Sequence, residues 1–232
     1  PIRCLMMGTV VMSANAEFKE GDVVTGLYGV AEYSIVAASA LKKVDTTLAK
    51  PSHYLGPLGM PGMTAWVGLV LIGEPKAGDQ VFVSSAAGAV GLIVGQLAKI
   101  RGCRVVGSVG TDQKVKMVKE EFGFDDAFNY NSETDWDATL ARYFPKGIDI
   151  YFDNVGGKML ESVLNHINMN ARIPICGMLS QYNQGEWRKR YGVRNLLNLV
   201  GKCAKMEGFL FDKYLHRMEE FARGGGRVCE RG

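Results

Sequence analysis

Residues 80–91 read Gln-Val-Phe-Val-Ser-Ser-Ala-Ala-Gly-Ala-Val-Gly, a short apolar run that passes into a turn of small residues. The run at 80–84 has the character of a strand, and residues 90–100 are apolar all along, as in a buried helix. Gly88 would let the backbone approach a phosphate group, and Gly91 would let the helix pack closely on the strand. Because N–H groups at a helix start attract anions, the pattern predicts a dinucleotide-binding turn. The alternative is a glycine-rich helix start without a ligand.

Strand-like and helix-like segments alternate downstream of this turn. Further strands are expected at 104–109, 126–130, 147–155, 171–177 and 206–211, and helices at 114–122, 135–143, 158–167 and 214–222. We expect the helix at 135–143 to be capped by Ser132 or Thr134, and the helix after 111 by Asp112. Alternation at this spacing is typical of parallel βαβ units, and it predicts an α/β fold with a doubly wound parallel sheet of the Rossmann type.

The first fifty residues differ from the rest. Short β-type runs at 22–27, 32–36 and 40–44 are punctuated by glycines, as at the end of an all-β unit. About fifty residues could hardly support an independent β-barrel. We therefore expect a partial β-rich domain at 1–51 and a dinucleotide-binding domain at 52–232.

The composition excludes several classes of protein. The 27 Lys and Arg residues nearly balance 24 Asp and Glu, so nucleic acid is not an expected partner. Charged residues and glycines interrupt every apolar stretch, so no membrane span is expected. The His residues stand far apart and no CxxC motif occurs, so we expect no metal site. We expect the thiols to be reduced, as in a cytoplasmic protein. The cysteines are Cys4, Cys103, Cys176, Cys203 and Cys229.

The end of the strand at 104–109 bears on the choice of nucleotide. NAD sites usually place an acidic residue there for the ribose 2′-hydroxyl. This chain instead has Ser108, Thr111 and Lys114, which suit a 2′-phosphate. The sequence thus favours NADP(H) over NAD(H), although Lys114 read alone could be a solvated helix residue.

Five stretches resemble one family in order along the chain. They are GMPGMTA at 59–65, SSAAGAVG at 84–91, FGFDDAFNY at 122–130, DNVGGKM at 153–159 and CGMLSQYN at 176–183. The chain is similar to the zinc-free alkenal/one double-bond reductases of the medium-chain dehydrogenase/reductase superfamily. The resemblance implies that residues 1–51 are the remnant of a GroES-like catalytic domain, because members carry a longer N-terminal domain and a further C-terminal segment. It also implies a homodimer.

The resemblance implies a role for each matching residue in binding NADPH. Each of these residues would contact one part of the cofactor: the nicotinamide end (Met63, Thr64), the pyrophosphate (Gly88, Ala89, Val90, Gly91), the 2′-phosphate (Lys114, Tyr130), the ribose or pyrophosphate (Asn154), the nicotinamide ribose (Cys176, Gly177) and the carboxamide (Phe209, Phe211). Ser108 and Ser180 complete the expected site. Ala87 departs from the pattern, because relatives often have Ser there.

The implied reaction transfers hydride from NADPH to the β-carbon of an α,β-unsaturated aldehyde or ketone. Negative charge then builds on the carbonyl oxygen, and the expected donor to it is the hydroxyl of Tyr182, either directly or through the ribose 2′-hydroxyl and water. The resemblance also implies that Tyr182 contacts the cofactor. Tyr182 could instead be a structural loop residue. Two other functions stay open: a zinc-free quinone reductase, and an NADPH-binding module that turns over poorly or not at all.

Overall fold

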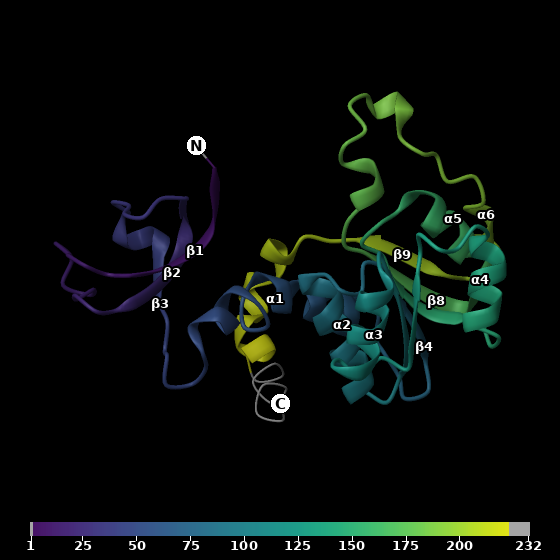
Figure 1. The fold of residues 1–232 in the computed structure, drawn as a ribbon, viewed down its shortest axis with the longest axis horizontal. Helices are drawn as coiled ribbons and strands as arrows, with labels where there is room; N and C mark the ends of the chain where they lie inside the picture. The colour runs from purple at the N-terminus through teal and green to yellow at the C-terminus, as the bar shows by residue number, and fades with distance from the viewer. Residues whose placement is uncertain (1, 223–232) are drawn as a thin grey trace. The chain divides into compact units, whose positions relative to one another are not determined.

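The computed structural model describes residues 2–222, and the chain divides between Pro61 and Gly62 into two compact units (Figure 1). The first unit contains an antiparallel sheet of β1 (Arg3–Thr9), β2 (Val23–Gly29) and β3 (Leu41–Lys43), in that order. Two short helical turns, η1 (Ala38–Ala40) and η2 (Pro51–Leu55), belong to the same unit.

Two expectations for this unit need correction. Strand β1, which pairs with β2 from Arg3↔Gly29 to Thr9↔Val23, was not expected from the sequence. The expected strand at 32–36 is absent, because the chain after β2 leaves the ladder and returns only at β3. The side chains of Tyr33 and Ile35 are exposed there.

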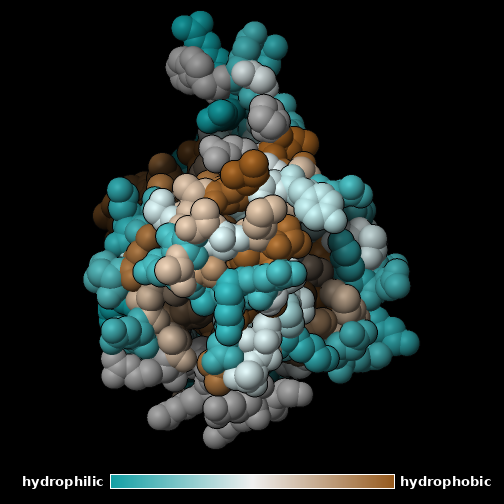
Figure 2. All heavy atoms as spheres, turned by 90° about the vertical axis from the view of Figure 1, so that its left-hand side faces the viewer, coloured by the Kyte–Doolittle hydropathy of each residue, from teal (hydrophilic) through white to brown (hydrophobic). Residues whose placement is uncertain are grey.

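The small sheet buries little apolar surface. Within the three strands and the residues that directly follow them, Val24 and Val44 are the buried valines, at 5% and 9% exposure. Figure 2, which looks from the left-hand side of Figure 1, shows hydrophobic residues in brown at the surface between hydrophilic ones in teal.

The second unit is built on six parallel strands, which confirms the expected fold class. Their order in the sheet is β6-β5-β4-β7-β8-β9, and their bounds are β4 (Gln80–Val83), β5 (Arg104–Val109), β6 (Asp126–Asn129), β7 (Ile148–Phe152), β8 (Ile167–Ile175) and β9 (Lys205–Gly208). The chain runs outward from β4 to β6 and then returns beside β4 as β7. In doubly wound sheets, ligands bind at the carboxyl ends of the strands at such a reversal.

Helices cover both faces of this sheet (Figure 1). Val81 and Val83 belong to the core on the side of α2 and α3, and Phe82 between them belongs to the core on the side of α4 and α5, because successive strand side chains point to opposite faces. The helical segments of the unit are α1 (Met60–Trp66), η3 (Val67–Ile72), α2 (Ala89–Ile100), α3 (Asp112–Glu120), α4 (Trp136–Tyr143), α5 (Gly157–His166), η4 (Leu179–Gln181), η5 (Trp187–Lys189), α6 (Leu197–Gly201) and η6 (Phe211–Arg217). No helix within the described residues is long and apolar enough to cross a membrane.

The helix caps differ from those expected. Thr111, not Asp112, caps α3: its hydroxyl accepts the N–H of Lys114 at 3.2 Å. Asp135, rather than Ser132 or Thr134, caps α4 and accepts the N–H of Ala138 at 3.1 Å. In each case the cap lies directly before the first helical residue, where a side-chain oxygen reaches the free N–H groups of the first turn.

The C-terminal elements are shorter than expected. Strand β9 ends at Gly208. The segment expected to be a helix at 214–222 begins as the tighter η6, and within that segment residues 218–222 are α-helical. Cys229 lies outside the described residues.

Candidate active site

The turn between β4 and α2 has the geometry of a phosphate cradle. Ser85 adopts the left-handed region at φ 52°, which is uncommon for a residue other than glycine. A Cβ atom on Gly91 would lie 2.5 Å from the carbonyl oxygen of Ser85 and 2.8 Å from Cα of Ala86, so only glycine fits. Helix α2 begins at Ala89 after Gly88, which provides no side-chain cap. The N–H groups of its first turn are therefore available to an anion.

Asn154 joins the ends of β4 and β7 beside this cradle. Its backbone N–H donates to the hydroxyl of Ser84 at 2.9 Å, and its side-chain amide donates to the carbonyl of Ser84 at 2.7 Å. Both residues are buried. The side-chain amide of Asn154 thus holds the two strand ends together at the point where the sheet reverses.

Asp153 fixes the loop that follows β7. Its Oδ1 accepts the N–H groups of Val155 and Gly156 and the hydroxyl of Tyr151, each at 2.8 Å. Burial raises the pKa of Asp153, and these hydrogen bonds oppose the rise. Gly156 stands at φ 66°, a conformation that favours glycine. The network holds the backbone of residues 154–156 in one position at the sheet edge.

The ends of β5 and β6 bring Lys114 and Tyr130 to the same edge. A Cβ atom on Gly110 would lie 2.8 Å from the hydroxyl of Tyr130, so this ring rests against the loop that opens α3. Lys114 lies exposed in the first turn of α3. The carboxylate of Asp112 accepts from the amide of Asn129 at 2.8 Å and is engaged there.

Ser108, unlike Lys114 and Tyr130, does not lie at the surface. It lies within β5 with 1% of its surface exposed, and its hydroxyl has no hydrogen-bond partner among the described residues.

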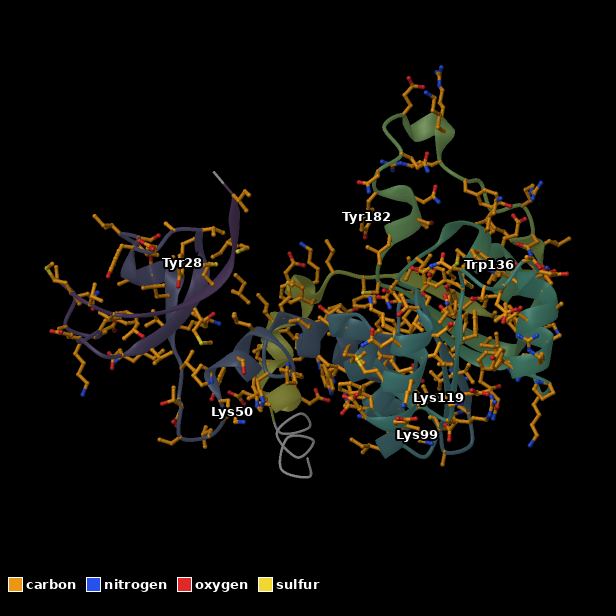
Figure 3. The ribbon with its side chains drawn as sticks, viewed as in Figure 1. Tyr28, Lys50, Lys99, Lys119, Trp136 and Tyr182 are labelled. Carbon is orange, nitrogen blue, oxygen red and sulfur yellow. The ribbon has the colours of Figure 1, made fainter. Side chains whose placement is uncertain are left out.

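Tyr182 stands at the base of an excursion, residues 178–196, that rises from the end of β8 (Figure 3). Its hydroxyl accepts the N–H of Met178 at 3.2 Å, and a Cβ atom on Gly177 would lie 2.8 Å from that hydroxyl. The hydroxyl of Ser180 donates to the carbonyl of Val155 at 2.6 Å. The excursion is therefore attached to the loop after β7, and the Tyr182 hydroxyl lies beside Gly177.

Cys176 occupies the end of β8. Its N–H donates to the carbonyl of Asp153 at 2.8 Å. Burial, with a smaller contribution from the charge of Asp153, raises the pKa of the Cys176 thiol to about 11. The thiol is therefore protonated at neutral pH, and Cys176 contributes its backbone to this edge.

The remaining expected residues lie in or against the core below the edge. Met63 of α1 is buried. Phe209 packs edge-on against Phe152 with ring centroids 6.3 Å apart, and Phe211 begins η6. Thr64 lies one residue after Met63 in α1. The carboxyl ends of β4, β5, β6, β7 and β8 thus bring together the cradle, Lys114 with Tyr130, and Tyr182.

A cavity of about 300 Å³ lies under the excursion. Its lining comes from α4, α5 and the excursion itself, and includes Trp136, Lys158, Gln184 and Tyr191. Sequence reasoning missed the residues that tie the excursion to α5, chiefly Glu161. Its partners lie about thirty residues away in sequence, and no local motif connects them.

Three comparisons place the chain among known proteins. The family model described as "Zinc-binding dehydrogenase" matches residues 89–223. The chain is 50% identical over 217 residues to a 2-alkenal reductase (NADP(+)-dependent) of Nicotiana tabacum, covering 93% of this chain and 62% of the relative. It is 48% identical over 214 residues to a (+)-pulegone reductase of Mentha piperita, covering 91% and 62%. The chain thus spans less than two thirds of the length of these relatives.

The fold matches a solved structure over nearly its whole length. CurA from Vibrio vulnificus in complex with NADPH superimposes with a TM-score of 0.90 at 38% identity, covering 99% of this chain and 69% of that one.

Proposed function

Because this chain belongs to the zinc-binding dehydrogenase family, the medium-chain dehydrogenases and reductases, we propose that it binds NADPH and reduces the carbon–carbon double bond of α,β-unsaturated aldehydes and ketones. The observation that carries the proposal is the position of Tyr182, whose hydroxyl lies beside Gly177 on the sheet edge that also holds the phosphate cradle. Relatives named alkenal and pulegone reductases support the choice of reaction.

Zinc has no place in this proposal. Among residues 2–222, no group of three or more His, Cys, Asp or Glu side chains is arranged to hold a metal ion. The described residues therefore do not fit the zinc site that the family description suggests.

The described residues do fit NADPH. Helix α2 begins after Gly88 without a side-chain cap, so the N–H groups of its first turn can face a pyrophosphate. Gly91 lets α2 pack closely on Ser85 and Ala86. Lys114 and Tyr130 would hold the 2′-phosphate, since an ammonium and a phenol hydroxyl are both donors to phosphate oxygens. Ser108 is left out of the proposed phosphate contacts because its hydroxyl is buried.

When bound, NADPH supplies a hydride donor at its nicotinamide ring. The work of the chain is to place the substrate carbonyl and to stabilise the charge that develops on its oxygen. The Tyr182 hydroxyl accepts a hydrogen bond from Met178, which leaves its own proton free to donate to that oxygen. An enone or enal is already polarised, so one such hydrogen bond suffices to direct addition to the β-carbon.

The variant Tyr182→Phe tests this role. It removes the donor and keeps the ring, so we expect kcat with an enal to fall by roughly tenfold to a thousandfold, as for a lost oxyanion donor, while the Kd for NADPH is unchanged. Tyr33→Phe is the control, because Tyr33 is exposed in the first unit. Full activity of Tyr182→Phe would exclude the hydroxyl as the donor. NADPH oxidation with quinones but not with enals would favour a quinone reductase instead.

A further inference from the structure

The excursion that carries Tyr182 is poorly supported by apolar packing. Residues 182–190 are exposed where their burial is described, and the cavity of about 300 Å³ lies under the segment. In Figure 1 the excursion is the green loop that rises above the sheet of the second unit. Val193, farther along the excursion, packs against the core. The described side chains of residues 182–190 have no such support, so hydrogen bonds must hold this part of the excursion in place.

Glu161 of α5 accepts four of these bonds. Its Oε1 accepts from the hydroxyl of Tyr191 at 2.8 Å and from the guanidinium of Arg194 at 2.9 Å. Its Oε2 accepts the backbone N–H of Arg194 at 2.8 Å, and its own carbonyl accepts from the amide of Asn195 at 2.7 Å. The side chain of Glu161 is 18% exposed. One helical residue thus holds the returning half of the excursion at four points.

The returning half in turn holds the half that carries Tyr182. The N–H of Tyr191 donates to Oε1 of Gln181 at 2.7 Å, and the Gln181 amide donates to the Ser180 hydroxyl at 2.8 Å. Ser180 bonds to Val155, as described above. Gln181 is buried and directly precedes Tyr182. A continuous series of hydrogen bonds therefore runs from α5 to the residue beside Tyr182.

We propose that Glu161 is a positioning residue: by holding Tyr191 it holds Gln181, and it thereby fixes the place of the Tyr182 hydroxyl over Gly177. The effect of Glu161 on the reaction rate rests on the proposed function of Tyr182. Its attachment of the excursion to α5 does not. Misplacement of a donor by about 1 Å is enough to cost a large factor in rate.

The hydrogen bonds from the Arg194 guanidinium, the Arg194 N–H and the Tyr191 hydroxyl lower the pKa of Glu161 to about 2. Glu161 is thus a carboxylate throughout the neutral range, and both of its oxygens remain acceptors. The attachment works as a constant support rather than as a switch at physiological pH.

Hydrogen–deuterium exchange of the backbone amides tests the mechanical part. In Glu161→Ala we expect the amides of Tyr191 and Arg194 to exchange at least about tenfold faster, because their acceptors are lost or released. Glu161→Gln keeps one acceptor oxygen and should show a smaller increase. Glu133→Ala is the matched control: the Glu133 side chain is 20% exposed and bonds Arg142 and Thr139 of α4 rather than the excursion.

Steady-state kinetics on the same variants test the catalytic part. We expect Glu161→Ala to lower kcat with an enal by roughly tenfold, with the Kd for NADPH within about twofold and partial rescue by Glu161→Gln. Unchanged exchange at residues 191 and 194 would overturn the attachment. Faster exchange with unchanged kcat would overturn the positioning role. Faster exchange in a protein that reduces no enal would leave the attachment standing and refute the proposed function instead.

Discussion

At the scale of single residues, the choice of nucleotide rests on two exposed donors and on one engaged carboxylate. Asp112 is an acid near the end of β5, where an acid could serve a ribose hydroxyl. In the structure one oxygen of its carboxylate accepts from the amide of Asn129 at the end of β6. Lys114 and Tyr130 remain at the edge, which supports a 2′-phosphate site.

Lys114→Ala should weaken NADPH binding by roughly tenfold or more while leaving NADH affinity unchanged, because a charge-assisted hydrogen bond contributes about 1.5–3 kcal/mol. Titration of each cofactor by fluorescence measures this directly. Lys116→Ala is the control, since Lys116 lies two residues on in the same helix and pairs with Glu120 at 3.9 Å. Equal loss of both cofactors, or no loss, would remove Lys114 from the phosphate site.

The thiols should differ in reactivity. Burial raises the pKa of both Cys103 and Cys176 to about 11. At pH 8 about one thiol in a thousand is then a thiolate, the reactive form. We expect iodoacetamide, followed by peptide mapping, to modify the exposed Cys4 and Cys203 first. Labelling of Cys176 as fast as Cys203 would show that the end of β8 is more open than described.

Side-chain hydrogen bonds between segments that are distant in the sequence could not be predicted from it. Lys114 and Tyr130 follow two neighbouring parallel strands, and the carboxyl ends of such strands lie at one edge of the sheet. The sequence pattern alone therefore predicts that these two residues share an edge. That Glu161 bonds to residues 191 and 194 depends on how a long connection folds back, and no periodicity encodes it. The burial of Ser108 could not be predicted, because β5 is buried on both faces. Its sequence therefore shows no alternation of polar and apolar residues that would tell which way the Ser108 side chain points.

At the scale of elements, hydrophobic pattern predicted the six parallel strands well. Strands buried on both faces read as continuous apolar runs, and the glycine turn fixed where α2 begins. The first unit was harder, because its described strands bury few apolar side chains, such as Val24, and the pattern is correspondingly weak. Caps were misplaced by one to three residues, since several neighbouring side chains were suitable acceptors.

Helix α2 packs closely against the ring of Phe124, which lies just before β6. A Cβ atom on Gly95 would lie 2.0 Å from the ring of Phe124. Gly95→Ala should lower the free energy of unfolding by up to about 2 kcal/mol, because overpacking costs about 1–3 kcal/mol and the gain in helix propensity offsets only about 1 kcal/mol of it.

Gly201→Ala in α6 is the control, since no atom lies within 4 Å of the added Cβ. It should be neutral or slightly stabilising. Urea denaturation of both variants measures the difference. A stabilised Gly95→Ala would mean that α2 sits farther from Phe124 than the structure shows.

In the whole molecule, the residues of the proposed reaction all belong to the Rossmann-type unit. The cradle, the two proposed donors to the 2′-phosphate and Tyr182 lie along the carboxyl ends of one parallel sheet. Relatives that the chain matches over about 62% of their length are named as reductases of unsaturated carbonyl compounds. The central claim is that hydride goes to carbon–carbon rather than carbon–oxygen double bonds.

The most direct measurement uses NADPH that carries deuterium at both C4 positions of the nicotinamide ring, with the protein and trans-2-hexenal as substrate. We expect a saturated aldehyde with one deuterium on its β-carbon, detected by mass spectrometry and NMR. Deuterium on the carbonyl carbon of an unsaturated alcohol, or no transfer from NADPH at all, would contradict it.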